Sequence, residues 1–447
     1  MRPFLELKPF PERQQGNGFF VDGVSLATIL ENHETPLYVT SLIAVEQRIQ
    51  IYSQTLKKHF PHSNIFYACK ANFAQPILKA VHQAGIGIDI VSIGEWHAAI
   101  KAGFSPQQIC FAGVGKKEKD WKETISKGIG YLNVEHIEEL ESILDFLANR
   151  KLDISKMPII SLRLNPCLEI ETHPHLKTGA LDSKFGILFS HFQDWFEQKK
   201  NSFSSEKFYD WIEPLSGIHV HIGSQLMAKS IFVHTVKSVL DCASFLFQNN
   251  VFVRHLDFGG GLGVSVHGVH SQGEDIKEHV NFLSNTLKEQ IPYYQNLRTL
   301  WKSDFSGLFV CLEPGRSVVA SSTVFLTSVL YTKVNASSSE KYQFCYVDGG
   351  MNDFPRPSIY GAEHFGEIVD FKVSVPHESS DFSYWKIVGP VCESGDYLSQ
   401  KTLLPMPHKN DIIAFFEGGA YCRSMASEYN LRPLPKEIFI KNHRIES

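Results

Sequence analysis

Residues 66–72 read Phe66-Tyr67-Ala68-Cys69-Lys70-Ala71-Asn72, a short apolar run that ends in a single lysine. The run predicts a buried strand with Lys70 at its end. Burial lowers the pKa of a lysine and leaves a neutral amine that can condense with an aldehyde. A lysine at a strand end can equally extend its charged group to the surface while only its methylenes are buried. The residues at the ends of the later strands decide between these two interpretations.

Strand-like and helical patterns alternate along the chain around this run. The predicted strands lie at residues 64–70, 87–92, 108–113, 131–135, 159–165, 215–223, 255–261 and 308–316. The predicted helices lie at residues 42–60, 74–84, 94–103, 116–128, 136–150, 228–249 and 276–290. Such alternation is typical of βαβ units and a parallel sheet. Eight strands over roughly 250 residues fit a (β/α)8 barrel, whereas seven would fit an open doubly wound sheet almost as well.

Two intervals interrupt this rhythm. Residues 166–190 are polar and turn-rich, and residues 199–208 have the composition of an exposed, mobile loop. The region 166–210 could therefore be a lid over the barrel or an ordinary surface insertion.

The helical rhythm stops after Arg316. Segments rich in β-branched and aromatic residues follow at 317–334, 342–348, 367–375, 384–391 and 411–416, a composition typical of strands. We therefore predict an α/β plus β architecture with two domains. A (β/α)8 TIM-type barrel comprises residues 42–316, and a β domain comprises residues 1–41 and the C-terminal all-β residues 317–447.

Composition excludes several classes of protein. A chain of 447 residues is too long for one ordinary core, and its net charge of −5 gives no general reason to expect nucleic acid or an anionic membrane as a partner. No apolar run is long enough to span a bilayer, and the N-terminus lacks the apolar core of a signal peptide. The eight cysteines are scattered without metal-like Cys/His spacing. We therefore expect a cytoplasmic protein with reduced thiols and no metal.

Residues that can react with a ligand or bind one recur where the predicted strands end. They are Lys70 on the first strand, Arg163 and Asn165 on the fifth, His219, His221 and Ser224 on the sixth, Gly259, Gly260 and Gly261 on the seventh, and Glu313, Gly315 and Arg316 on the eighth. The carboxyl ends of barrel strands meet at one rim, where barrel enzymes place their active sites. A glycine run alone usually marks a turn. A lysine, a histidine, a glycine loop, an acid and an arginine on one rim form a far more specific pattern.

These residues could bind pyridoxal phosphate. A phosphate needs backbone N–H groups without side chains in the way, which residues 259–261 can supply. Ser224 can add a hydroxyl, and Arg316 can add a charge-assisted hydrogen bond.

The remaining rim residues suit the aldehyde and the ring of the same cofactor. Lys70 would form the Schiff base, and Glu313 would keep the ring nitrogen protonated so that the ring withdraws electrons. His221 could stack on the ring face. His219 lies two residues earlier on the same side of a regular strand, and we interpret it mainly as a structural residue.

The sequence resembles the fold-type III pyridoxal-phosphate decarboxylases, which are alanine racemase-like barrels. Within that group it resembles the diaminopimelate decarboxylases. The resemblance runs from about residue 35 to about residue 433. The matching residues are Tyr67-Ala68-Cys69-Lys70-Ala71-Asn72, Thr172-His173 with Lys184-Phe185-Gly186-Ile187, Gly217-Ile218-His219-Val220-His221-Ile222-Gly223-Ser224-Gln225, Gly259-Gly260-Gly261-Leu262-Gly263, Glu313-Pro314-Gly315-Arg316, Gly349-Gly350-Met351-Asn352-Asp353, Arg356-Pro357 with Tyr360-Gly361-Ala362, Gly389-Pro390-Val391-Cys392-Glu393-Ser394-Gly395-Asp396 and Gly419-Ala420-Tyr421.

The resemblance implies a role for each of these positions. The implied cofactor-binding residues are Lys70, His221, Ser224, Gly259, Gly260, Gly261, Glu313, Gly315, Arg316 and Tyr421. Arg316, Arg356 and Tyr360 are implied at the distal carboxylate of the substrate, and Glu393 at its distal ammonium. Tyr421, which would reach the cofactor phosphate, completes the implied substrate-binding residues. Lys70 and Cys392 are the implied catalytic residues, with Cys392 as the proton donor. A guanidinium suits a carboxylate and a carboxylate suits an ammonium, so these roles are chemically consistent.

The same resemblance implies the reaction and the assembly. The reaction is decarboxylation of meso-2,6-diaminopimelate to L-lysine and CO2, a step of lysine biosynthesis. The assembly is a head-to-tail homodimer in which each active site receives Cys392 and Glu393 from the other subunit.

Three other functions stay open from the sequence. A sister decarboxylase of the same fold could act on ornithine, arginine or a carrier-bound amino acid, and a substrate without a distal carboxylate would not need Arg356. A non-catalytic pyridoxal-phosphate carrier is a second possibility, although such relatives lack a second domain. A racemase would return a proton to Cα without losing CO2.

Overall fold

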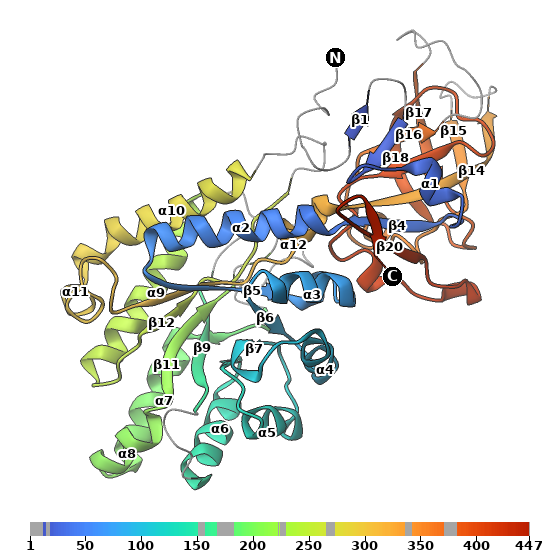
Figure 1. Ribbon diagram of the computed structural model, residues 1–447. Helices are drawn as coiled ribbons and strands as arrows, with labels where there is room; N and C mark the ends of the chain where they lie inside the picture. Colours follow the sequence, from blue (N-terminus) through green and yellow to red (C-terminus); the bar gives the residue numbers. More distant parts are fainter. Residues whose placement is uncertain are drawn as a thin grey trace. The chain divides into compact units, whose positions relative to one another are not determined.

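The computed structural model describes residues 12–14, 18–150, 157–167, 183–221, 223, 229–264, 273–335, 342–370 and 382–446. These residues divide into two compact units. The barrel unit contains the described residues of 49–263 and 273–315, and the β unit contains the described residues of 1–48 and 316–447, together with Val264. Figure 1 shows the alternating strands and helices of the barrel unit and the sheet of the β unit.

Eight parallel strands close into a barrel in the barrel unit. They are β5 (His62–Ala68), β6 (Gly87–Ile90), β7 (Ile109–Phe111), β8 (Tyr131–Val134), β9 (Ile159–Asn165), β11 (Leu215–Val220), β12 (His255–Asp257) and β13 (Phe309–Leu312). Each strand pairs with the next in this order, and β13 pairs with β5 to complete the ring. A short strand, β10 (Ile187–Leu188), pairs in addition with Leu164 and Asn165 at the C-terminal end of β9. The predicted (β/α)8 barrel is confirmed, and the open doubly wound sheet is excluded.

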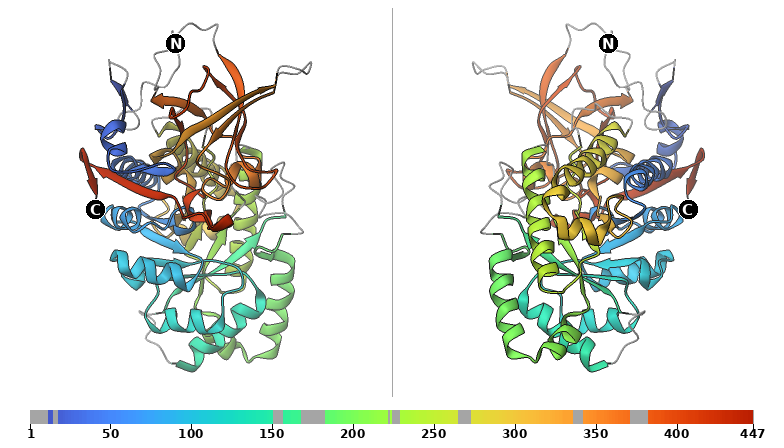
Figure 2. Two further views of the ribbon diagram at one scale, coloured as in Figure 1. Left: turned by 90° about the vertical axis from the view of Figure 1, so that its right-hand side faces the viewer. Right: turned by 90° about the vertical axis from the view of Figure 1, so that its left-hand side faces the viewer.

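Helices lie on the outside of this ring of strands, as Figures 1 and 2 show. They are α3 (Gln75–Gln83), α4 (Ile93–Ala102), α5 (Glu118–Ser126), α6 (Ile137–Arg150), α7 (Phe189–Ser202), α8 (Ser205–Ile212), α9 (Lys229–Gln248), α10 (Glu274–Gln290) and α11 (Gln295–Trp301), while α2 (Leu42–His59) crosses the boundary between the units. In the part of the chain that the structure describes, no helix has both the length and the apolar character that crossing a membrane requires.

Local sequence explains where these elements begin and end, and α4 is an example. Ser92 caps its first turn, because the Ser92 hydroxyl accepts a hydrogen bond from the Glu95 backbone N–H at 3.2 Å. The Glu95 carboxylate in turn accepts from the Val91 N–H at 2.7 Å. Gly103 ends the helix with a φ of 108°, a left-handed conformation that favours glycine.

One end of the barrel interior is filled by side chains from four different strands. Phe66, Cys110 and Cys311 form a buried cluster, and Tyr131 and Phe309 pack against it. Aromatic rings of this size fill the lumen of an eight-stranded barrel, so it is a packed core and not a channel.

The β unit is a curled, mostly antiparallel sheet. Its longer path runs β18 (Tyr397–Leu404), β17 (Ser383–Val388), β15 (Tyr342–Val347), β14 (Thr323–Asn335), β4 (Leu37–Ser41), β20 (Lys436–Lys441) and β21 (Arg444–Glu446), with β19 (Ile412–Phe415) pairing β14 and β16 (Gly366–Asp370). The N-terminal strands β1 (Glu12–Gln14), β2 (Gly18–Val21) and β3 (Val24–Ser25) form a separate small sheet, and the short helices of the unit are α1 (Leu26–Leu30), α12 (Arg316–Val319) and α13 (Arg356–Tyr360). The strand β4 joins this sheet through pairing with β14, and the hydroxyls of Thr40 and Thr323 lie 2.9 Å apart across that pair.

One parallel pair within this sheet positions two loops. The strands β15 and β17 run parallel, with Phe344 opposite Lys386 and Tyr346 opposite Val388. The segments that follow these two strands therefore leave the sheet at the same end. Residues 348–353 follow β15 there, and residues 389–396 follow β17.

The structure corrects two predictions. Residues 199–208, predicted as an exposed mobile loop, lie in α7 and α8 and in the short turn between them. The turn is held because the Phe203 ring stacks on Trp211 at 5.2 Å. The strand expected from residue 317 begins only at Thr323, because α12 and a 3-10 turn at Ala320–Ser322 come first.

Candidate active site

Lys70 lies on a turn that local hydrogen bonds fix. The strand β5 ends at Ala68, and Lys70 occupies the middle of a 3-10 turn at Cys69–Ala71. The Tyr67 hydroxyl donates to the Asn72 carbonyl at 2.9 Å, and the Asn72 side chain accepts from the Ala74 N–H at 3.0 Å. These contacts present the Lys70 side chain at the carboxyl end of the first barrel strand.

Asp89 faces Lys70 from the next strand. Register places Ala68 of β5 opposite Asp89 of β6, and Lys70 Nζ donates to Asp89 Oδ2 at 3.2 Å. The Asp89 side chain is fully buried, whereas that of Lys70 is 36% exposed. Burial raises the pKa of Asp89 to about 8, with the Lys70 charge opposing that rise. A buried carboxyl group with a raised pKa can exchange a proton with the amine that it contacts, which is compatible with the nucleophilic interpretation of Lys70.

Glu313 follows the last barrel strand and is buried among polar groups. Its Oε2 accepts a hydrogen bond from His219 Nε2 at 3.0 Å, and its Oε1 accepts from Asn133 Nδ2 at 3.1 Å. Burial favours the neutral acid, but the charge and hydrogen bond of His219, together with Lys70, hold the pKa of Glu313 below its ordinary value. Glu313 is therefore a carboxylate at neutral pH, able to pair with a protonated ring nitrogen.

The glycine loop after β12 packs tightly against the rim. Gly259 N–H donates to Asp257 Oδ1 at 2.8 Å, and Gly260 N–H donates to His221 Nδ1 at 3.1 Å. A Cβ on Gly259 would lie 2.7 Å from His221 Nδ1, and one on Gly260 would lie 2.4 Å from the Glu313 carbonyl oxygen. The loop can approach these neighbours only because it carries no side chains.

Replacing Gly259 by alanine is expected to lower the free energy of unfolding by about 2–5 kcal/mol. The left-handed φ of 62° contributes about 1–2 kcal/mol of strain and the close packing about 1–3 kcal/mol. Gly85→Ala is the matched control, since Gly85 has a φ of 75° and no atom within 4 Å of an added Cβ. Urea unfolding measures the stability of the two variants. Equal losses of stability would show that close packing around Gly259 does not contribute to the effect.

His221 is neutral in this environment. Burial, followed by the charges of Lys70 and Arg163, lowers its pKa well below the ordinary value. Because Nδ1 accepts the hydrogen bond from Gly260, the proton of the neutral ring lies on Nε2. A neutral imidazole has a face that can stack on an aromatic ring.

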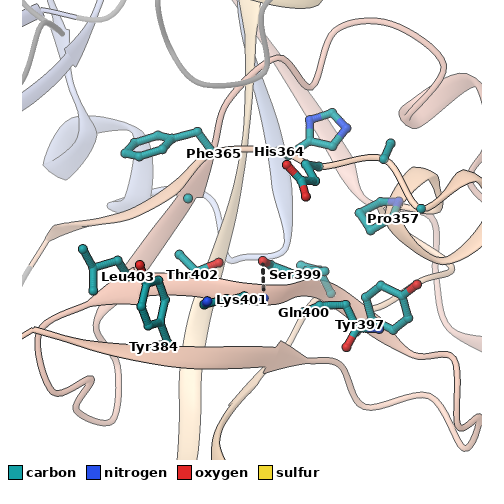
Figure 3. A pocket seen from close by; sticks show the side chains of 15 residues that line it. Pro357, His364, Phe365, Tyr384, Tyr397, Ser399, Gln400, Lys401, Thr402 and Leu403 are labelled. Carbon is teal, nitrogen blue, oxygen red and sulfur yellow. Dashed lines mark hydrogen bonds between the residues drawn. The ribbon is translucent and has the colours of Figure 1, made fainter.

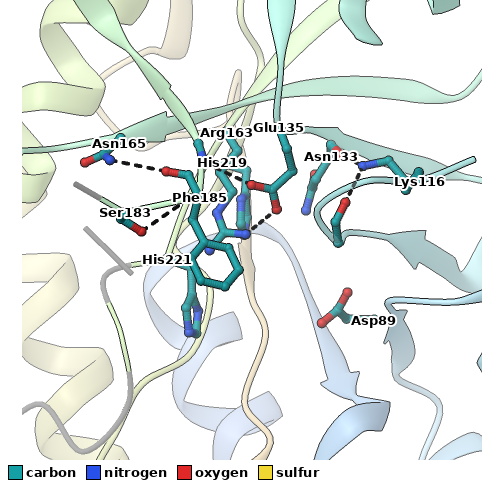
Figure 4. Close-up of polar contacts among 12 residues, drawn as sticks. Asp89, Lys116, Asn133, Glu135, Arg163, Asn165, Ser183, Phe185, His219 and His221 are labelled. Carbon is teal, nitrogen blue, oxygen red and sulfur yellow. Dashed lines mark hydrogen bonds and ion pairs between the residues drawn. The ribbon is translucent and has the colours of Figure 1, made fainter. Parts of the chain in front are cut away.

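A buried ion pair supports the neighbouring part of the rim, as Figure 4 shows. Arg163 at the end of β9 pairs with Glu135, which follows β8. The Glu135 carboxylate also accepts from the Gly186 N–H at 3.0 Å, and the Asn165 side chain donates to the Phe185 carbonyl at 3.2 Å. The Arg163 guanidinium lies 4.8 Å from the centre of the Phe185 ring. Residues 185–186 are thus fixed to two strand ends.

Two buried arginines form a second group, within the β unit. Arg316, the first residue of α12, lies 4.8 Å from the centre of the Tyr421 ring, and Arg356, the first residue of α13, lies 5.8 Å from that of Tyr360. Both arginines are less than 8% exposed. Burial, followed by the charge of Arg356, lowers the pKa of Arg316 to about 10, so Arg316 remains a cation at neutral pH.

The Arg356 guanidinium has a hydrogen-bond donor left for an anion. Within the described part of the chain, Arg356 Nε is a buried donor without a hydrogen-bond partner. A buried cation is strongly destabilising unless it is paired, and the planar guanidinium fits a carboxylate. Arg356 is therefore suited to bind a carboxylate group of a ligand.

Cys392 and Glu393 lie in the turn that follows β17, and both are exposed. The Cys392 backbone N–H donates to Asn430 Oδ1 at 3.2 Å, and the Tyr429 hydroxyl donates to Glu393 Oε1 at 2.5 Å. An exposed thiol and carboxylate of this kind are accessible to a ligand or to another protein chain.

A separate pocket of about 610 Å³ lies in the β unit beside α13 and β18 (Figure 3). Across its floor, the Lys401 ammonium lies 4.2 Å from the centre of the Tyr384 ring. None of the predicted site residues is among the described residues that line it. The pocket is thus distinct from the pair formed by Arg316 and Arg356.

The structure brings most of the predicted rim residues together and adds others. Ser224 and residues 172–173 lie outside the described residues, while Gly315 is buried after β13. Sequence reasoning missed Asp89 and Asn133, which contact Lys70 and Glu313. Asp89 had a signal, since it is a lone acid within the apolar run Gly87-Ile88-Asp89-Ile90.

Pyridoxal phosphate fits this set of residues. The lysine amine, the ionised Glu313 and the neutral His221 match the aldehyde, the ring nitrogen and the ring face of that cofactor. The close-packed glycine loop leaves the rim free of side chains at residues 259 and 260. Because the N–H groups of Gly259 and Gly260 are already bonded, their contacts with the phosphate stay a prediction.

Comparison with known proteins identifies the family. Residues 46–320 match the model of the pyridoxal-dependent decarboxylase family, pyridoxal binding domain. Diaminopimelate decarboxylase of Aquifex aeolicus is 33% identical, with 100% of this chain and 96% of that protein covered. The Helicobacter pylori enzyme of the same name is 35% identical, with 93% of each chain covered. This chain belongs to the diaminopimelate decarboxylase family. Membership of this family, with its pyridoxal binding domain, implies pyridoxal 5'-phosphate as the cofactor.

A solved structure of the family agrees with the fold. The crystal structure of Helicobacter pylori diaminopimelate decarboxylase complexed with L-lysine has a TM-score of 0.77 and 32% sequence identity, and covers 94% of this chain and 95% of that one. The predicted membership of the diaminopimelate decarboxylase family, and of a carboxy-lyase class, is thereby confirmed.

Proposed function

We propose that this protein decarboxylates meso-2,6-diaminopimelate to L-lysine and CO2 with pyridoxal 5'-phosphate as cofactor. Membership of the diaminopimelate decarboxylase family supports this reaction, because it is the one that gives the relatives their name. The buried cationic pair of Arg316 and Arg356 is the structural observation that supports it most strongly. A substrate such as ornithine has no distal carboxylate and would leave the buried donor Arg356 Nε without an anion.

The rim residues of the barrel would hold the cofactor. Lys70 would bond its aldehyde carbon, Glu313 its ring nitrogen and His221 its ring face, while Arg316 and Tyr421 would reach its phosphate or the substrate. When bound, pyridoxal phosphate supplies an electron sink for the electrons that remain at Cα when CO2 leaves. Asp89 would hold the proton that Lys70 loses when its amine acts as a nucleophile.

The β unit would hold the far end of the substrate and return the proton. Arg316, Arg356 and Tyr360 would bind the distal carboxylate, and Glu393 would bind the distal ammonium. This clamp would set the bond from Cα to the reacting carboxylate in the orientation that allows its cleavage. Cys392 would then donate a proton to Cα as the general acid.

A substrate panel tests the choice of substrate. The purified protein, loaded with pyridoxal phosphate, is given meso-diaminopimelate, ornithine, arginine or lysine, and CO2 release is measured at equal concentrations. We expect release from meso-diaminopimelate alone. Faster release from ornithine or arginine would move the assignment to a sister decarboxylase, and product with an inverted Cα but no CO2 would indicate a racemase.

We also propose a cytoplasmic homodimer with shared active sites. Cys392 and Glu393 lie beside exposed apolar side chains, of which Tyr429 is 47% exposed and Leu431 is 96% exposed. A second copy of the chain would cover such a surface. All eight cysteines are free, as expected in a reducing compartment.

Mixing two inactive variants tests the shared site. Equal amounts of Lys70→Ala and Cys392→Ala protein, allowed to exchange subunits, should recover about a quarter of the wild-type activity. Random pairing makes about half of the dimers mixed, and each mixed dimer has one of its two sites intact. Affinity tags of two kinds confirm the mixed dimers. If mixed dimers form without any recovery, each site is built within one chain.

A further inference from the structure

Three loops of the β unit meet around Cys392 and Glu393. Residues 348–353 follow β15, residues 389–396 follow β17, and residues 427–432 lie near the C-terminal end of the chain. Asp396 joins the first two loops, because its carboxylate accepts from the Met351 N–H and the Val391 N–H, each at 2.6 Å. Asp396 is 5% exposed, so this double hydrogen bond is shielded from water.

The third loop is anchored at the base of the first. The Ser427 N–H donates to the Asn352 carbonyl at 2.9 Å, and Arg432 Nη2 donates to the Asp348 carbonyl at 2.9 Å. The two ends of residues 427–432 are thereby fixed to the segment that leads into Arg356. The middle of the loop, Tyr429 and Asn430, is the part that reaches Cys392 and Glu393.

Both contacts from this middle part reach residues with proposed roles. Asn430 Oδ1 accepts from the Cys392 N–H at 3.2 Å, and the Tyr429 hydroxyl donates to Glu393 Oε1 at 2.5 Å. The hydrogen bond and the charge of Glu393 raise the pKa of Tyr429, so the phenol keeps its proton at neutral pH. The second oxygen of Glu393, Oε2, can accept a hydrogen bond from a cation such as an ammonium group.

The backbone at this point is strained. Asn430 and Leu431 have φ angles of 55° and 56°, in the left-handed region that L-residues rarely adopt. Such conformations persist where the surrounding structure fixes them, and they cluster at functional sites. In this conformation the Asn430 side chain accepts from the Cys392 N–H.

We propose that Tyr429 is a positioning residue that makes the protein selective for the distal ammonium of its substrate, by holding Glu393 in the orientation in which Oε2 accepts that ammonium. This inference rests on the proposed function of Glu393. Asn430 supports the same turn through the backbone of Cys392. Without the Tyr429 hydroxyl, the exposed Glu393 side chain is free to adopt other rotamers and loses part of its preorganisation.

The test compares two ligands that differ by the distal amino group. The full-length protein with pyridoxal phosphate is assayed for its KM with meso-diaminopimelate and for the inhibition constant of 2-aminopimelate, which keeps both carboxylates but lacks the distal amine. Tyr429→Phe should raise the KM for meso-diaminopimelate about tenfold, the effect of one hydrogen bond to a charged group. It should change the inhibition constant of 2-aminopimelate less than about twofold, because that ligand does not use Glu393.

Controls separate positioning from a structural role. Tyr293→Phe removes a hydroxyl from a side chain that is 81% exposed and should change neither constant. In a Glu393→Gln background, Tyr429→Phe should add less than about twofold to the KM, because the two residues act as a unit. Parallel weakening of both ligands by Tyr429→Phe, or full additivity with Glu393→Gln, would overturn the inference.

The outcomes also distinguish this inference from the proposed function. A wild-type protein that forms no lysine from meso-diaminopimelate overturns the proposed function, and the inference with it. A wild-type protein that forms lysine, with a Tyr429→Phe variant of unchanged KM, overturns the inference alone.

Discussion

Replacing Lys70 by alanine is expected to lower the turnover of meso-diaminopimelate by on the order of 10³-fold or more. The variant loses the nucleophilic amine, and it also loses the proton exchange between Lys70 and Asp89. Proton transfer by a positioned side chain alone contributes about 10²–10⁴-fold in enzymes. The measurement is CO2 release at saturating substrate, together with the mass of the protein after borohydride reduction in the presence of pyridoxal phosphate.

Two control variants make the result specific to the amine of Lys70. Lys70→Arg keeps a cation beside the buried Asp89 but cannot bond an aldehyde carbon, so it should be as inactive as Lys70→Ala. Lys79→Ala removes an exposed lysine from α3 and should leave turnover unchanged. Wild type and Lys79→Ala should gain the mass of one reduced cofactor at one lysine, and both Lys70 variants should not. Retained turnover in Lys70→Ala would show that another residue performs this step.

Replacing Arg356 by alanine is expected to raise the KM for meso-diaminopimelate by on the order of 10²–10³-fold. Truncating one partner of a buried, hydrogen-bonded charge pair costs about 2–5 kcal/mol in binding. The effect on kcat should be smaller, since Arg356 contacts the substrate far from the bond that breaks. Steady-state kinetics over a range of meso-diaminopimelate concentrations separates the two constants.

Matched variants define what the Arg356 guanidinium contributes. Arg356→Lys keeps the charge but not the planar fork and should recover only part of the affinity. Arg444→Ala removes an exposed arginine from β21 of the same unit and should have no effect. If Arg356→Ala lowers kcat and leaves KM unchanged, the distal carboxylate is bound elsewhere.

The sequence predicts the barrel well, because each of its strands is a short apolar run between helical patterns. All eight predicted strands are present, and most end a few residues earlier than predicted. Lys70 is one example, since it lies in the turn after β5 and not in the strand itself. The difference arises because the predicted strands include residues of the turn that follows the last paired residue, as at Glu313 to Arg316 after β13.

The contacts among the site residues could not be predicted in the same way. Glu313 meets Asn133 across 180 residues of sequence, and Asp89 meets Lys70 only because β5 and β6 pair in the observed register. These contacts form only when the barrel closes, and no local sequence pattern predicts which strands become neighbours.

The wrong prediction at residues 199–208 has a local cause. The polar residues between Lys199 and Lys207 are typical of a loop, but aromatic residues flank them. Phe196 and Phe208 are fully buried, and their rings pack 5.1 Å apart edge to face. This contact holds α7 and α8 together, so the polar residues form the exposed side of two helices.

The most direct test of the whole account is the formation of L-lysine and CO2 from meso-diaminopimelate by the purified protein loaded with pyridoxal phosphate. Lysine and CO2 are quantified together over time, with Lys70→Ala as the blank. The account predicts equal amounts of both products from the wild type and none from the blank. A wild-type protein that binds pyridoxal phosphate at Lys70 but forms no lysine would contradict it.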